Sequence, residues 1–250
     1  MAGHLHFAFV ADSSEQIAGV CLRAQDSTLV GEVVGEADPT VVHAQVARIH
    51  THDIDGRDWP RVGKRDLVMG RLQARYPGLR PVCFFSPYEA AAWALISHPI
   101  HITQAARIKA RLAEELGPAV EIHGRKDHAF PRPSRLMQLE TFPGVFGHKV
   151  AYLHQLAQAT LEGKLEATFL RALPLEQALE HLKTLPGIGD FSLSSFSCAE
   201  QASQMLCPRT NRDWVAPLPW PTVWIISRQP RRPGRLPKTG VPTEPGEACY

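Results

Sequence analysis

The segment 182–189, Leu-Lys-Thr-Leu-Pro-Gly-Ile-Gly, constrains the fold more than any other part of this chain. It ends an amphipathic segment in which leucines recur at helical spacing from Leu175 to Leu185. Pro186 cannot continue a helix, and the two glycines allow the backbone angles of a tight hairpin. We therefore predict a helix that ends at Leu185, followed by a hairpin whose Ile188 packs between two helices.

A hairpin of this kind exposes several backbone N–H groups together, next to the positive end of the helix that follows. Such a group of amides binds a DNA phosphate without reading the base sequence. The sequence therefore predicts DNA binding at Leu185, Gly187, Ile188 and Gly189. The alternative is that Leu-Pro-Gly-Ile-Gly is only a turn between two packed helices.

A weaker relative of this hairpin lies upstream, where residues 142–149 read Phe-Pro-Gly-Val-Phe-Gly-His-Lys. Its Lys149 is either a further phosphate contact or a solvated helix residue, and the sequence leaves both interpretations open.

The charge balance argues for a local DNA site. With 27 Lys and Arg against 25 Asp and Glu, the formal net charge is +2, so no uniformly basic surface is expected. No window approaches the roughly eighteen apolar residues of a membrane span, and the first residues lack the pattern of a secretion signal. We expect a cytoplasmic protein without membrane contact.

Cysteine and histidine spacing gives no support to a metal or cofactor site. The five cysteines are far apart and form no C-x-x-C pair, which also argues against a disulfide framework. The closest histidine groups are His50 with His52 and His98 with His101, and both lack further ligands at metal spacing. We expect neither a metal nor a cofactor.

Hydrophobic patterning predicts an α+β chain. Residues 5–50 alternate short apolar runs with Gly, Asp and Ser breaks, and this favours strands at 5–10, 28–34 and 41–49. Ser86 and Pro87 read as the start of a helix, and further helices are predicted at 103–116, 147–161 and 175–185. The sequence thus predicts a small N-terminal α/β domain over 1–82 and an all-α domain over 83–192. Residues 193–250 are rich in proline and arginine, and we expect a disordered tail there.

Several segments occur in an order that is typical of one protein family. They are Asp53 to Gly56, Gly70 to Cys83, Ser86 to Ser97, Gln104 to Lys109 and the hairpin itself. On these segments, residues 40–192 resemble the DNA-3-methyladenine glycosylases of the AlkA-like branch of the helix-hairpin-helix superfamily. This resemblance implies an enzyme that flips an alkylated base out of duplex DNA and cleaves its N-glycosidic bond. The implied partner is double-stranded DNA that contains damaged bases, and the implied state is a monomer.

The resemblance also implies an aromatic pocket for the flipped base. Trp93, Tyr88 and Tyr76 are the candidates for this pocket, and Arg71 and Arg75 are candidates for the walls of the cleft. The alternative for each aromatic is a place in the core, because an aromatic on an apolar helix face is usually buried. His98-Pro99 stands where the family is expected to have a polar turn that contains Gln.

The family places its catalytic aspartate about sixteen residues after the last hairpin glycine. That position is occupied by Met205. Asp190 lies too close to the hairpin, and Asp213 lies inside the aberrant tail. We therefore predict no catalytic residue in this chain.

A shift of reading frame accounts for both the missing aspartate and the unusual tail. If one nucleotide was lost near codons 192–193, the neighbouring frame is compatible with a helical, family-like continuation that has aspartate in place of Met205. The alternative is a true divergent C-terminus. The function expected from the sequence is a base-excision DNA glycosylase, inactive in this form. The alternative function is a non-catalytic helix-hairpin-helix DNA-binding protein.

Overall fold

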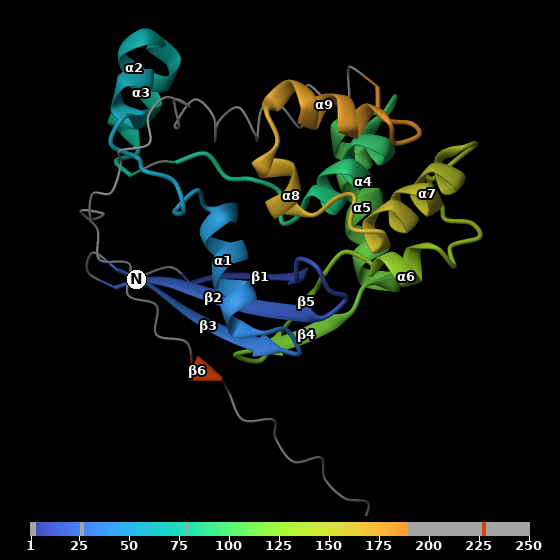
Figure 1. Cartoon of the computed structure of the whole chain (residues 1–250). Helices are drawn as coiled ribbons and strands as arrows, with labels where there is room; N and C mark the ends of the chain where they lie inside the picture. The colour runs from blue at the N-terminus through green and yellow to red at the C-terminus, as the bar shows by residue number, and fades with distance from the viewer. Residues whose placement is uncertain (1–3, 26–27, 79, 190–226, 229–250) are drawn as a thin grey trace, which may run out of the picture.

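The chain begins with an antiparallel sheet. In a computed structural model that describes residues 4–25, 28–78, 80–189 and 227–228, this sheet has the order β1-β2-β3-β6 (Figure 1). Residue pairing is regular, so that His6 lies opposite Cys21, and Cys21 lies opposite Glu32. The strands are β1 (His4–Val10), β2 (Ile17–Gln25), β3 (Thr28–Gly35) and the parallel two-residue β6 (Ser227–Arg228).

Helix α1 (Pro39–Ile49) covers one face of this sheet, where Val42 and Val46 pack on Phe9. The expected strand over 41–49 is therefore wrong. Asp38 accepts a hydrogen bond from the Thr40 N–H, and Pro39 occupies the first turn, so a capped helix starts here despite the β-branched residues that follow.

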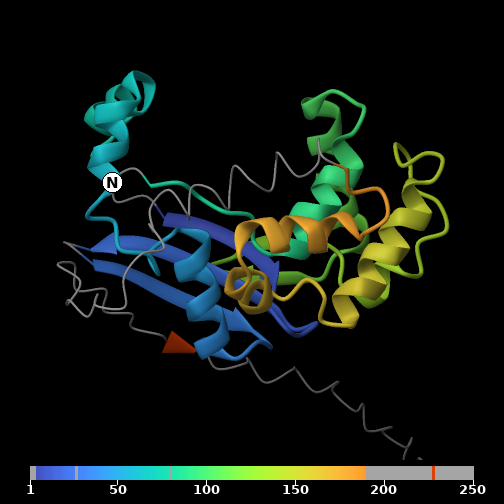
Figure 2. The same cartoon turned by 45° about the horizontal axis from the view of Figure 1, so that its top comes forward.

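Two short helices, α2 (Trp59–Arg65) and α3 (Leu67–Arg75), form a separate projection. Figures 1 and 2 both show them standing away from the sheet and from the remaining helices. Asp66 caps α3 by accepting hydrogen bonds from two backbone N–H groups, and Trp59 packs with Ile54 in a small apolar cluster at the base. The sequence did not predict these helices.

The helical half contains most of the core. Helix α4 (Pro87–Ser97) is almost wholly buried and is capped by Ser86, whose hydroxyl accepts a hydrogen bond from the Glu89 N–H. The main apolar cluster of this half includes Leu112, Leu153 and Leu156, which are among the most buried side chains. The helices are α4 (Pro87–Ser97), α5 (Ile102–Leu116), α6 (Pro133–Leu136), α7 (Lys149–Leu161), α8 (Ala167–Ala172) and α9 (Leu175–Lys183).

A β-hairpin interrupts this helical half, so the expected all-α domain over 83–192 is wrong at this point. It consists of β4 (Ala119–Ile122) and β5 (Arg125–His128) and covers the face of the sheet opposite α1. Each strand has only four residues, which is too short for a clear alternating pattern. A hairpin from the second half of the chain thus covers the sheet of the first half.

The predictions for the C-terminal part of the chain lie almost entirely outside the described residues. This holds for the expected disorder of 193–250, for the frame change near 192–193 and for position 205. Within the ranges that the structure does describe, no helix has the length and apolar character needed to cross a membrane.

Candidate nucleic-acid interface

The predicted hairpin after α9 is a type II turn. The Ile188 N–H donates to the Leu185 carbonyl at 3.1 Å, and Gly187 has a φ of +82°. A type II turn needs this positive φ at its third residue and favours proline at its second, here Pro186. The sequence Leu-Pro-Gly-Ile therefore determines the shape of the hairpin.

Side chains of the hairpin anchor it in the helical core. Leu185 and Ile188 are 5% and 6% exposed, and both belong to the main apolar cluster. Of the four residues predicted to bind DNA, these two hold the hairpin in place and do not present their side chains to solvent.

The two glycines face different surroundings. A Cβ atom on Gly187 would lie 2.6 Å from Leu95 Cδ2 and 2.7 Å from Tyr152 Cδ2, so the hairpin fits closely against α4 and α7. A Cβ on Gly189 would meet nothing within 4 Å. Both glycines are exposed, and neither N–H donates to another residue in the described part of the chain. These N–H groups are the hairpin's available donors for a phosphate.

A second turn of the same type precedes α7. The Val145 N–H donates to the Phe142 carbonyl at 2.9 Å, and Gly144 has a φ of +96°. Phe142 and Val145 are buried like Leu185 and Ile188 in the first hairpin. The weak sequence similarity between the two segments therefore reflects the same backbone turn.

Lys149 lies at the start of α7, one turn before Tyr152, the residue that contacts the hairpin. Its Nζ donates to the Ile96 carbonyl at 2.7 Å, at the C-terminal end of α4, and burial lowers its pKa. Phe146, in the loop just before Lys149, is 69% exposed. Sequence reasoning gave Phe146 no role, although an aromatic residue next to a glycine in a loop is a usable signal.

The three residues predicted to line a base pocket do not come together. Trp93 borders a cavity of about 340 Å³ between the sheet and helices α4 and α5. Tyr88 is buried, and its hydroxyl donates to the Pro131 carbonyl at 3.0 Å. Burial raises the pKa of Tyr88 well above its usual value. Tyr76 is exposed at the end of α3, in the projection, where Arg75 lies over its ring.

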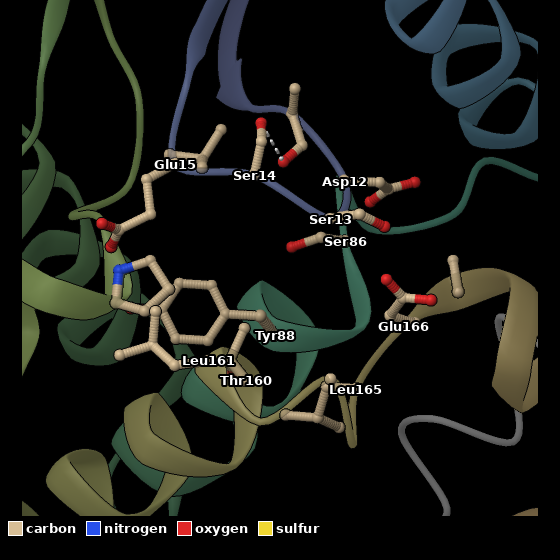
Figure 3. Close-up of a pocket in the computed structure, with 15 residues that line it drawn as sticks. Asp12, Ser13, Ser14, Glu15, Ser86, Tyr88, Thr160, Leu161, Leu165 and Glu166 are labelled. Atoms are coloured by element: carbon tan, nitrogen blue, oxygen red, sulfur yellow. Dashed lines mark hydrogen bonds between the residues drawn. The ribbon is translucent and has the colours of Figure 1, made fainter.

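Figure 3 shows a second cavity, of about 180 Å³, between the β1–β2 connection and the segment that follows α7. Tyr88 lines it, and the carboxylates of Asp12, Glu15 and Glu166 are distributed around it. Arg48 pairs with Asp12 at 2.8 Å, but burial still raises the pKa of Asp12 above its ordinary value. A cavity lined by three carboxylates repels phosphate, so it is an unsuitable place for the DNA backbone.

The structure does not describe the positions at which the sequence analysis looked for a catalytic carboxylate. Met205, Asp190 and Asp213, the positions considered for a carboxylate, all lie outside the described residues.

Comparison with known proteins relates both the sequence and the fold to DNA glycosylases. No protein-family profile matches the chain. DNA-3-methyladenine glycosylase 2 of Escherichia coli strain K12 is 32% identical over 137 residues, which are 52% of this chain and 46% of that protein. The 3-methyladenine DNA glycosylase of Archaeoglobus fulgidus has a TM-score of 0.57 at 19% identity, covering 80% of this chain and 69% of that one. The resemblance to AlkA-like DNA glycosylases is confirmed.

A further similar structure is the 8-oxoguanine glycosylase/lyase of Clostridium acetobutylicum, solved with double-stranded DNA. Its TM-score is 0.53 at 15% identity, and the match covers 81% of this chain and 77% of that one. The mixed helix and strand content of the chain fits the fold of these glycosylase structures. The sequence match spans slightly less than half the length of the Escherichia coli relative.

Proposed function

We propose that this chain binds double-stranded DNA containing damaged bases through the hairpin 185–189, as part of base-excision repair. The observation that carries the proposal is the hairpin itself, whose buried leucine and isoleucine hold two exposed glycine N–H groups at the surface. Backbone N–H groups position a duplex by its phosphates and carry no base specificity. Gly187 and Gly189 therefore provide affinity for any duplex.

Lys149 and Phe146 extend this interface. The Lys149 ammonium, which donates to the Ile96 carbonyl at the end of α4, adds a positive charge that attracts a phosphate. The exposed ring of Phe146 offers a surface on which a base can stack.

We propose alkylated bases as the damage recognised. Support comes from the names of the Escherichia coli and Archaeoglobus fulgidus relatives, which are both 3-methyladenine DNA glycosylases. Loss of such a base leaves positive charge on the sugar, and a carboxylate is the group that stabilises this charge and orients water.

The second candidate function is DNA binding without catalysis, and the residue that favours it is Met205 at the position expected for that carboxylate. Thioether sulfur cannot stabilise the positive charge or accept the proton of water. We therefore propose that the chain with Met205 binds duplex DNA and releases little or no base.

The test compares this chain with the product of the same gene in which the reading frame is restored near codon 192. Both proteins are incubated with methylated duplex DNA, and abasic sites are measured by strand cleavage in alkali. We expect similar duplex binding, with base release at least about 100-fold lower in the chain that has Met205. Comparable release from both would show that another carboxylate serves, and absence of binding in both would refute the DNA-binding proposal.

A further inference from the structure

Four side chains of metal-ligating type converge on the N-terminal sheet. They are His4 and His6 of β1, Cys21 of β2, and His123 between β4 and β5, and one ligand atom from each lies within 4.8 Å of the others. The hairpin proposed to bind DNA belongs to the helical half instead. This cluster is therefore distinct from the proposed function.

The fold explains why these residues meet. His4 and His6 are two positions apart on β1 and so point to the same face, and Cys21 pairs directly with His6 across the sheet. The β4–β5 hairpin covers this face, and its turn brings His123 over the strands. Because His123 is about a hundred residues away in sequence, spacing alone gives no sign of the cluster.

Two of the distances already match those of a zinc site. Nδ1 of His4 lies 3.3 Å from Sγ of Cys21, and Nε2 of His6 lies 3.5 Å from the same sulfur. A tetrahedral Zn²⁺ with usual bond lengths places nitrogen and sulfur ligands about 3.5 Å apart. All four ligand atoms lie within 4.8 Å of one another, so a contraction of about 1 Å brings them to tetrahedral spacing.

His123 occupies an unusual place for its residue type. It has a φ of +51° and is followed by Gly124 at +75°, so the two residues form the type I′ turn of a two-residue β-hairpin. Asn, Asp and Gly are preferred at this first position, and a histidine there carries backbone strain. Its Nε2 also lies 2.8 Å from Glu32 Oε2, and a carboxylate beside a histidine is the usual support of a metal ligand.

One of the three histidines is incompletely held by hydrogen bonds. Nδ1 of His6 is buried and has no hydrogen-bond partner among the described residues. The rings of His6 and His123 are 5.6 Å apart, and those of His4 and His123 are 6.2 Å apart. Three imidazoles crowded around one thiol are better matched to a shared cation than to one another.

We propose that His4, His6, Cys21 and His123 form a structural Zn²⁺ site that fastens the β4–β5 hairpin to the N-terminal sheet. Nitrogen and thiolate ligands in a set of four are typical of structural zinc. Binding requires that the Cys21 thiol release its proton to solvent as the Zn–S bond forms. The ion connects residues from both halves of the chain.

The test uses the full chain, freed of metal and titrated with Zn²⁺ against a coloured chelator, and separately with Co²⁺. To isolate one thiol, Cys83, Cys198, Cys207 and Cys249 are all replaced by serine. We expect one Zn²⁺ per chain and, with Co²⁺, the absorption of a tetrahedral cobalt thiolate. Zn²⁺ should also raise the melting temperature.

Two variants of this background decide the assignment. Cys21→Ser should abolish the cobalt–thiolate absorption, and His123→Ala should weaken Zn²⁺ binding by at least about 10- to 100-fold, the loss typical when a ligand merely loses its supporting partner. His148→Ala, in the helical half, is the matched control and should bind like the parent. Circular dichroism without metal shows whether each variant folds.

The proposal is overturned if the folded parent binds less than one Zn²⁺ per chain. It is also overturned if Cys21→Ser keeps the cobalt–thiolate absorption, or if His123→Ala and His148→Ala bind Zn²⁺ equally. None of these three results depends on DNA binding, so failure here leaves the proposed function intact.

Discussion

Gly187 and Gly189 stand two positions apart in one hairpin, yet they have different surroundings. Gly187 combines a positive φ with close contacts to Leu95 and Tyr152, whereas Gly189 has open space around it. The first glycine is required by packing, and the second leaves open space for the proposed phosphate contact.

We expect Gly187→Ala to lower the free energy of unfolding by about 1–3 kcal/mol, because it adds strain at positive φ and displaces its two neighbours. Gly189→Leu should leave this free energy unchanged within about 0.5 kcal/mol and weaken binding to all duplexes alike. Urea denaturation and duplex titration measure the two effects.

Gly163→Ala is the control for Gly187→Ala, since Gly163 has a φ of +77° but no atom near its missing Cβ. Gly163→Ala should lower the free energy of unfolding by less than Gly187→Ala does. Unchanged DNA affinity in Gly189→Leu would remove Gly189 from the interface.

We expect the buried imidazole of His50, which follows α1, to make the free energy of unfolding depend on pH. Burial lowers its pKa below 6.5, and its Nε2 is buried without a hydrogen-bond partner among the described residues. The folded chain therefore binds fewer protons there than the unfolded chain, and the free energy of unfolding should fall as the pH is lowered from about 7 to about 5.

Replacement of this histidine should flatten that dependence. Urea denaturation of wild type and His50→Leu at about pH 7 and about pH 5 makes the comparison, and the difference between the two pH values should be smaller in the variant. The same slope in both proteins would assign the effect to other groups, of which His52 is the next to examine because burial lowers its pKa too.

Helices α4 and α5 are joined by an ion pair between Glu89 and Lys109, and the Lys109 ammonium also lies 5.8 Å from the centre of the Phe130 ring. The Glu89 side chain is 6% exposed and that of Lys109 is 27% exposed. Removing one partner leaves the other charge in a largely apolar environment.

We expect Glu89→Ala to cost about 2–3 kcal/mol in unfolding free energy, below the full value for a buried pair because Lys109 keeps some solvent. The double variant Glu89→Leu with Lys109→Met should recover most of the loss. Glu115→Ala, which removes the exposed pair with Arg111 on the same helix, should cost less than about 0.5 kcal/mol. Equal costs for Glu89→Ala and Glu115→Ala would contradict this account.

The long helices could be predicted from the sequence because their ends carry strong local signals. Proline or glycine marks the limits of α4, α5 and α7, and each prediction falls within about two residues of the observed helix. Helix α1 is mistaken for a strand because its β-branched residues suit one, and the helix is indicated by the cap at Asp38 and by Pro39 in the first turn. The short strands β4 and β5 offer too few residues for a pattern.

The candidate interface was predictable only where it is local. Pro186 and Gly187 favour a type II turn wherever they occur, so the hairpin followed from the sequence. Whether Trp93, Tyr88 and Tyr76 share a pocket depends on how separate helices pack, and no local pattern contains that information. The cluster around Cys21 escapes sequence reasoning for the same reason.

The two halves of the molecule fit together closely where β4 lies on the sheet. A Cβ atom on Gly19 of β2 would be 2.6 Å from Val120 Cγ1, so this glycine permits the contact. We expect Gly19→Val to cost about 1–3 kcal/mol by forcing β4 off the sheet. Thermal unfolding should become broader or split into two steps as the halves separate.

The paired change Gly19→Val with Val120→Ala tests this explanation, because the smaller side chain returns space to the interface. It should regain part of the stability that Gly19→Val loses. No regain would place the cost within the sheet itself.

Strands β4 and β5 belong to the second half of the chain but cover the sheet of the first half. During synthesis on the ribosome, the sheet is therefore made before its cover. The first strands emerge early, but the hairpin that covers them is synthesised about a hundred residues later. At about 5–20 residues per second, one face of the nascent sheet stays bare for about 5–20 s. During this interval Ala8 and Ile17 present an apolar surface to the cell, and a nascent chain stalled before residue 119 should recruit chaperones that the finished protein does not need.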